Sequence, residues 1–227
     1  MRIELQKYLT EQYQKSIDKN TKASPIITIS RQYGCSAKNL AIELLKQLKA
    51  HNNNLREWVW INKEVFNDTA KSLNLKQKRV QHVFEGKKMG LIDSIIMIST
   101  ERYYKSDITI KKKMIEVVRS FAENGNTIII GLGSALICRD IKKSFHVKLI
   151  APFEWRIKNA AEKRKRSISE VRKYAKEIDQ KRDNLRKSFE TKNGYEELFD
   201  LTFNVMQMGY KEIAEIIIFS MKNRQII

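Results

Sequence analysis

The 227-residue chain is strongly basic, with 44 Lys and Arg residues against 26 Asp and Glu residues and a formal net charge of +18. Its length favours one domain with a subdomain over two separate domains. A mean hydropathy of −0.49, with no long apolar run and no signal-peptide core at the start, argues against a membrane span or membrane partner. Two cysteines make no disulfide framework, so we expect a protein of the reducing cytoplasm.

The excess of positive charge predicts a polyanionic ligand, such as a nucleotide, a nucleic acid or an anionic surface. A compositional bias toward Lys, Asn and Ile, with a solvated basic surface, explains most of these charges equally well. The charge is unevenly spread, because the segment 155–187 holds 13 Lys and Arg residues against 5 Asp and Glu residues. This segment alone carries nearly half of the net charge.

The first elements follow a polar N-terminal extension, residues 1–24, which contains a possible helix over 5–17 and ends in a linker. Pro25 then opens a predicted strand over 26–30, whose almost continuous apolar run is typical of a strand buried on both faces. Residues 39–48 repeat apolar side chains at helical spacing and predict an amphipathic helix.

The rest of the chain alternates between strand and helix patterns. The segment 63–123 is predicted to be mostly helical and to end at Gly125, and a last helix with Ile213, Ile216 and Ile217 on its apolar face closes the chain. Four further strands are predicted at 58–61, 127–131, 146–151 and 200–205. This alternation indicates an α/β fold with a parallel sheet, in which ligands lie beyond the carboxyl ends of the strands.

Three clusters of small or polar residues fall at these strand ends, at 30–38, 131–134 and 151–154. The first is a short turn between a strand and a helix, a place where backbone N–H groups attract phosphate. Its sequence Gly34-Cys35-Ser36-Ala37-Lys38 is close to the phosphate-loop consensus G-x-x-x-x-G-K-[ST] but breaks it. A purely structural turn would show the same pattern.

Five blocks of sequence, in order, resemble the cytidylate kinase-like family, relatives of cytidylate kinase among the nucleoside monophosphate kinases. The resemblance covers roughly residues 25–220, in the blocks 27–34, 131–134, 146–157, 179–186 and 199–204. It implies a three-layer P-loop kinase-like domain over 25–227 with a five-stranded parallel sheet. It further implies a helical acceptor-binding insertion at about 62–123 and a basic lid at about 155–187.

The same resemblance implies an ATP-binding phosphotransferase that uses Mg²⁺ and moves the γ-phosphoryl group of ATP to CMP or a related monophosphate. Such catalysis is mostly positioning and charge neutralisation, which several arginines and backbone donors can supply. We therefore expect nucleotide substrates and an enzyme of the kinase type.

In the loop, Gly34 matches the first glycine of the family pattern Tyr-Gly-Ser-Gly-Gly-Arg. The residues that follow it take the Ser, Gly, Gly and Arg positions, so two glycines have acquired side chains where a backbone approaches phosphate. Arg31 or Lys38 could supply the missing charge. The resemblance thus implies a phosphate- and nucleotide-binding group made of Arg31, Gly34, Cys35, Ser36, Ala37, Lys38 and Asn39.

In the lid, Arg156 matches the arginine that opens the family's lid, and Arg182 and Arg186 match its closing segment; all three are implied to be catalytic. Gly131, Gly133 and Asp183 are implied to bind the acceptor. Between the two glycines Leu132 replaces the family's arginine, and leucine cannot bind a phosphate. An exposed ion pair between Asp183 and Arg186, which share a helical face, is the alternative explanation of those two residues.

Two other residues carry open alternatives. Cys35 lies near a predicted helix start beside basic residues, which can lower a thiol pKa, but the simpler explanation, which we favour, is a small residue that replaces serine. His146 begins a strand and is expected to be structural. For the whole chain, the alternatives to a kinase are a catalytically impaired relative that still binds nucleotide, and a nucleic-acid-binding protein that uses the basic segment 155–187.

Overall fold

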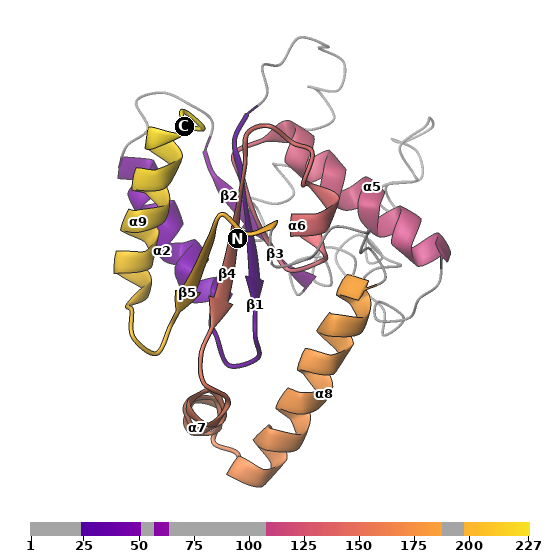
Figure 1. Cartoon of the computed structure of the whole chain (residues 1–227), viewed down its shortest axis with the longest axis vertical. Helices are drawn as coiled ribbons and strands as arrows, with labels where there is room; N and C mark the ends of the chain where they lie inside the picture. Colours follow the sequence, from indigo (N-terminus) through magenta and orange to yellow (C-terminus); the bar gives the residue numbers. More distant parts are fainter. Residues whose placement is uncertain (1–23, 51–56, 64–107, 188–197) are drawn as a thin grey trace, which may run out of the picture.

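The computed structural model describes residues 24–50, 57–63, 108–187 and 198–227, which form an α/β fold (Figure 1). A five-stranded sheet lies at its centre in the order β2-β3-β1-β4-β5, and every neighbouring pair is parallel. The strands are β1 Ile26–Arg31, β2 Val59–Ile61, β3 Thr127–Ile130, β4 Ser144–Ile150 and β5 Leu201–Asn204. The predicted parallel five-stranded sheet is therefore confirmed.

Helices cover both faces of the sheet and produce three layers (Figure 1). Helices α2 (Ala37–Ala50) and α9 (Tyr210–Asn223) pack together on one face. Helices α5 (Ile108–Asn124) and α6 (Ser134–Ile137) lie on the other face. A pair of helices, α7 (Phe153–Arg164) and α8 (Ile168–Lys187), stands beyond the carboxyl ends of the strands (Figure 1) and spans the basic segment that the sequence predicts to be a lid.

The central strand β1 explains why the sheet needs cover on both sides. Ile26, Ile27, Thr28 and Ile29 are all fully buried, so consecutive side chains, which point to opposite faces, both meet packed helices. This is the arrangement that a continuous apolar run predicts for a parallel sheet.

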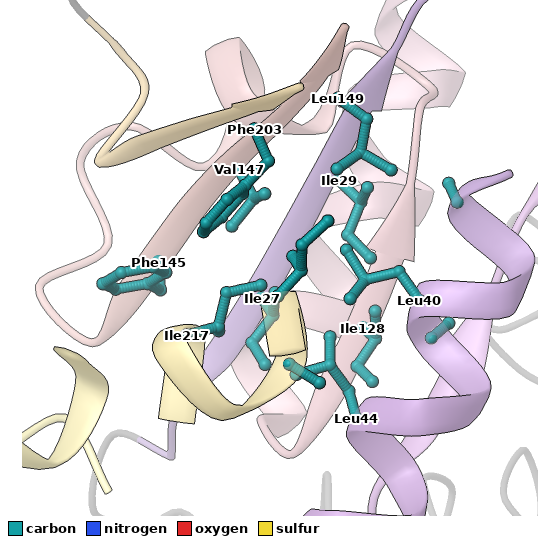
Figure 2. Close-up of a cluster of buried hydrophobic side chains, with 14 of the residues drawn as sticks. Ile27, Ile29, Leu40, Leu44, Ile128, Phe145, Val147, Leu149, Phe203 and Ile217 are labelled. Carbon is teal, nitrogen blue, oxygen red and sulfur yellow. The ribbon is translucent and has the colours of Figure 1, made fainter. Parts of the chain in front are cut away.

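The helix α2 turns its apolar stripe toward the sheet. Leu40 and Leu44 are fully buried and lie against Ile27 and Ile128, as Figure 2 shows. Ile217 of α9 completes the same cluster. Each fully buried aliphatic side chain of this kind stabilises the fold by roughly 1.5–3 kcal/mol, so this layer holds the start of α2, and with it the preceding loop, in place.

One buried polar group lies within the sheet. His146 is buried, its Nδ1 lies 2.7 Å from Thr28 Oγ1 and its Nε2 lies 3.0 Å from Ser144 Oγ. Its backbone N–H donates to Asp200 Oδ2 at 2.6 Å. Burial lowers the pKa of the imidazole and so favours its neutral form. His146 has the structural place expected of it.

Most predicted boundaries lie within two residues of the observed ones, and α5 ends at Asn124 before Gly125, as predicted. Gly125 has a φ of +68°, and a Cβ there would lie 1.9 Å from the Cβ of Ser24, so only glycine fits. The predicted N-terminal helix and most of the predicted acceptor-binding insertion lie outside the described residues. The division into extension, insertion and lid stays a prediction.

Candidate functional site

A cavity of about 300 Å³ opens at the carboxyl end of the sheet, on the side of α5 and α6. Its walls come from the ends of β1 and β3, the turn after β3, α6 and the face of α8 that looks toward the sheet. Six of the predicted site residues line it: Arg31, Gly131, Gly133, Arg182, Asp183 and Arg186. The fold therefore brings together residues that are more than 150 positions apart in the chain.

The cavity lining is predominantly basic. Five Lys or Arg side chains and two Asp side chains contribute to it, and the five bases are Arg31, Lys63, Lys148, Arg182 and Arg186. Convergent positive charge in a concave site raises the local concentration of anions. A phosphorylated ligand is therefore the chemistry that suits this cavity.

The arginines of α8 are held in place by neighbouring groups. Arg186 Nη2 lies 2.6 Å from Asp183 Oδ1, one turn away on the same helix. Arg182 Nη1 donates to the carbonyl oxygen of Arg31 at 3.3 Å, across the cavity mouth. Both arginine side chains are about a quarter exposed and line the cavity.

The turn after β3 has an unusual backbone. Gly131, Leu132 and Gly133 have φ values of +72°, +62° and +69°, so three consecutive residues are left-handed. The left-handed backbone favours glycine at position 131, and the guanidinium of Arg31 fills the space beside it, because a Cβ there would lie 2.0 Å from Arg31 Nη1. Leu132 is 3% exposed and bears left-handed strain that costs an L-residue roughly 1–2 kcal/mol. Strain of this kind is concentrated at functional sites.

The phosphate-loop candidates lie outside this cavity, with the exception of Arg31. Gly34, with a φ of +89°, packs against α7: a Cβ there would lie 2.8 Å from both the Cβ and the carbonyl oxygen of Arg156. Cys35 and Ala37 are buried, Ser36 is half-buried, and Lys38 and Asn39 are exposed on the first turn of α2. The close contact between Gly34 and α7 leaves no room for a side chain, and this is enough to explain the glycine at this position.

Several backbone N–H groups of this loop donate to acceptors inside the protein. Tyr33 N–H donates to Asp179 Oδ1 at 2.7 Å, and Ser36 N–H donates to the hydroxyl of Tyr210 at 2.9 Å. The N–H groups of Cys35 and Ala37 donate to carbonyl oxygens of the loop itself. Side chains from α8 and α9 therefore satisfy loop amides that a phosphate would otherwise engage.

Arg156 is a buried connector rather than a cavity residue in this structure. It is 5% exposed, and its Nε donates to the carbonyl oxygen of Ala151 at 3.0 Å. Its Nη1 donates to the carbonyl oxygen of Tyr33 at 2.8 Å and to Asp179 Oδ2 at 2.7 Å. Arg156 thereby ties the end of β4, the loop and α8 together, and its contact with a nucleotide stays a prediction.

The environment of Cys35 distinguishes between its two explanations. Burial raises the pKa of its thiol to about 11, and this effect exceeds that of the nearby Arg156 guanidinium, which acts in the opposite direction. The loop buries the side chain instead of presenting it to solvent, so the environment does not favour the reactive, low-pKa thiol that was one of the two explanations. Cys35 is a small buried residue, which was the favoured explanation.

Three charged residues of the cavity lining were not among the predicted site residues: Lys63, Lys148 and Asp179. Lys63 follows the short strand β2, and Lys148 is the one charged residue within the predicted strand 146–151. That interruption was a usable signal, because a buried parallel strand has little reason to carry a lysine unless its head reaches the strand end. Asp179 lies in a block that matched the family, three residues before Arg182.

The described residues offer no resident metal site. Within the described ranges, no group of three or more His, Cys, Asp or Glu side chains could hold a metal ion. Asp179 and Asp183 of α8 line the cavity, but each is paired with an arginine. Mg²⁺ bound by such a protein would come with nucleotide phosphates, which commonly supply much of its coordination.

Comparison with known families identifies the fold and the family. The model of the cytidylate kinase-like family matches residues 26–207. The chain belongs to the cytidylate kinase-like family. This membership supports a kinase-like, nucleotide-binding function in general terms, which agrees with the basic cavity at the carboxyl edge of the sheet.

A similar solved structure is an uncharacterized protein from Eubacterium ventriosum, with a TM-score of 0.61 and 14% sequence identity. The match covers 88% of this chain and 99% of that chain, and at this identity it shows the fold alone. No curated protein sequence gives a significant match. None of the helices in the described ranges is both long enough and apolar enough to cross a membrane.

Proposed function

We propose that this protein is an ATP-dependent phosphotransferase that binds CMP or a related monophosphate in the basic cavity between β1, β3, α6 and α8. The cavity carries the proposal. It combines five basic side chains with a position at the carboxyl edge of a parallel sheet, where ligands of α/β proteins bind. Its volume is at the lower end of the range for small-molecule sites, about 300–1,000 Å³.

In this proposal the arginines of the cavity neutralise phosphate charge. Arg182 and Arg186 present partly exposed guanidinium groups from α8, and Arg31 approaches from β1. Phosphoryl transfer depends mainly on positioning and charge neutralisation, to which forked guanidinium groups are suited. Asp183 orients Arg186, and the turn at Gly131 brings the guanidinium of Arg31 against the backbone of the cavity wall.

The donor nucleotide would lie on the other side of β1, at the loop and the first turn of α2. We assign it the group from Gly34 to Asn39, with Mg²⁺ entering as part of the MgATP substrate. The start of a 14-residue helix faces this place, and a helix N-terminus favours phosphate. Arg156 holds the loop to the lid beside it.

Calorimetry with MgATP, followed by transfer of a radiolabelled γ-phosphoryl group to a panel of nucleoside monophosphates, tests the proposal. Turnover with at least one acceptor is expected. Arg186→Ala should lower turnover about 100-fold, the usual scale for removing one preorganised charge-stabilising group. Arg172→Ala is the matched control, because Arg172 lies on the same helix, pairs with the exposed Glu154 and does not line the cavity. Equal turnover in both variants would remove Arg186 from the mechanism.

A catalytically impaired nucleotide-binding relative is the second candidate. Two observations favour it: side chains of the protein satisfy loop amides, and Leu132 replaces the arginine expected between the two glycines. The same experiment separates the two candidates, since ATP binding with no transfer to any acceptor supports the second. Salt-dependent polynucleotide binding without nucleotide binding would replace both with a nucleic-acid-binding function.

A further inference from the structure

The carboxylate of Asp179 occupies a place that is built to hold an anion. Its Oδ1 accepts the N–H of Tyr33 at 2.7 Å, and its Oδ2 accepts Arg156 Nη1 at 2.7 Å. Arg182 Nη1 lies 3.7 Å from Oδ1. One backbone amide of a strand-to-helix loop and two guanidinium groups thus surround a single carboxylate.

This donor set is the one that proteins use for phosphate oxygens. Backbone N–H groups before a helix bind phosphate, and arginine makes short charge-assisted bonds to phosphate and carboxylate alike. Carboxylate and phosphate present similar oxygen acceptors, so groups placed to hold one can hold the other. The site around Asp179 has the chemistry of a phosphate site that already contains an anion.

The position of Asp179 connects the loop with the cavity. It lines the cavity together with Arg182, and its side chain is 25% exposed, whereas that of its partner Arg156 is 6% exposed. The arginine is therefore fixed in the interior by the carbonyl oxygens of Ala151 and Tyr33, while the carboxylate reaches it from α8. Of these groups, Asp179 and Arg182 line the cavity, whereas Tyr33 and Arg156 do not.

We propose that the carboxylate of Asp179 is an internal stand-in for a nucleotide phosphate, and that phosphate binds to Tyr33 N–H, Arg156 and Arg182 only when α8 withdraws this carboxylate. The inference rests on the proposed function for the identity of the displacing ligand, a nucleotide. Its consequence is that the ligand-free protein holds its lid against the loop and that phosphate competes with Asp179 for the same donors.

Pyrophosphate, measured by calorimetry, is the probe that tests the competition directly. Asp179→Asn keeps the shape of the side chain and removes the charge, so it should bind pyrophosphate about fivefold more tightly or better, because like charges a few ångströms apart repel even in water. Glu177→Gln is the matched control: it removes one negative charge from the exposed face of the same helix and should leave the affinity unchanged. Equal affinity in Asp179→Asn and the wild type, weaker affinity in the variant, or no binding to either protein would overturn the proposal.

Hydrogen–deuterium exchange of the wild type decides the matter if Asp179→Asn does not fold. Saturating pyrophosphate should slow exchange in the peptide that contains Tyr33 and speed it in the peptide of α8 that contains Asp179. No change, or slower exchange in both peptides, would overturn the proposal. The proposed function alone would be wrong if no monophosphate accepted a phosphoryl group while Asp179→Asn still bound pyrophosphate more tightly than the wild type. If the wild type transferred phosphoryl groups but bound pyrophosphate as tightly as Asp179→Asn does, only the stand-in role of Asp179 would be wrong.

Discussion

Replacement of Arg156 by lysine should destabilise the protein in the absence of any nucleotide. The guanidinium serves three acceptors at once: the carbonyl oxygens of Ala151 and Tyr33 and the carboxylate of Asp179. A lysine ammonium is a point donor on a flexible stem and cannot reproduce this fork. Arg156→Lys keeps the positive charge, so the substitution tests geometry and leaves the net charge unchanged.

The expected magnitude follows from the groups left without a donor. An unsatisfied buried acceptor costs about 1–3 kcal/mol, and lysine can still reach one of the three, so the two acceptors left without a donor give a loss of about 2–6 kcal/mol. Asp179 keeps the N–H of Tyr33 and the nearby Arg182, which makes the lower half of that range the better expectation. Against a typical stability of about 5–15 kcal/mol the change is easily measured.

Urea unfolding followed by tryptophan fluorescence measures this loss. Arg172→Lys is the control, since Arg172 belongs to the same helix pair and forms a forked but exposed bond to Glu154. It should change the free energy of unfolding very little. If Arg156→Lys were as stable as Arg172→Lys, the buried connections of Arg156 would not hold the loop to the lid. Arg156 would then be available for the ligand contact that its place in the lid predicts.

Two further predictions follow from buried titratable groups. Burial raises the pKa of Cys35 to about 11 and that of Cys138 to about 12. Neither thiol should therefore react with a disulfide reagent at about pH 8 until denaturant is added. Rapid labelling of the native protein would contradict the buried positions of the two side chains. Burial lowers the pKa of His146 below its ordinary value of 6.5, so the unfolded chain binds the proton first. Stability present above about pH 6.5 should be lost as the pH falls toward the folded-state pKa, and His146→Gln should show a shallower loss in urea unfolding over the same range; parallel curves would refute this.

The architecture could be predicted from the sequence because each strand and helix has its own spacing of apolar residues. The run at 26–30 predicts a strand buried on both faces, and Leu40 and Leu44 recur at helical spacing; these local regularities reflect burial, which the sheet and its helices then confirm. The segment 155–187 could be distinguished by its excess of Lys and Arg residues. Boundaries were less accurate, because strand ends depend on pairing with a neighbour, as where Ser144 pairs with Ile26.

Only some of the residues of the candidate site could be predicted from the sequence. Arg31, Arg182 and Arg186 were selected one by one, and the fold places them around one cavity. Lys148 and Asp179 were missed because nothing local distinguishes a lysine whose head reaches a cavity, or an aspartate that accepts a loop amide, from an ordinary charged residue. Such roles depend on partners more than 100 residues away.

The sequence by itself determined the alternation of strands and helices and the parallel sheet, because these depend on the order and spacing of apolar residues. Tertiary structure alone decided what the glycine loop and the lid arginines contact. Gly34 is glycine because the backbone of Arg156 lies against it, and the amide of Tyr33 is taken by a carboxylate from α8. The physical reason is that hydrogen-bond donors act over about 3 Å, and only the folded chain brings these groups within that distance.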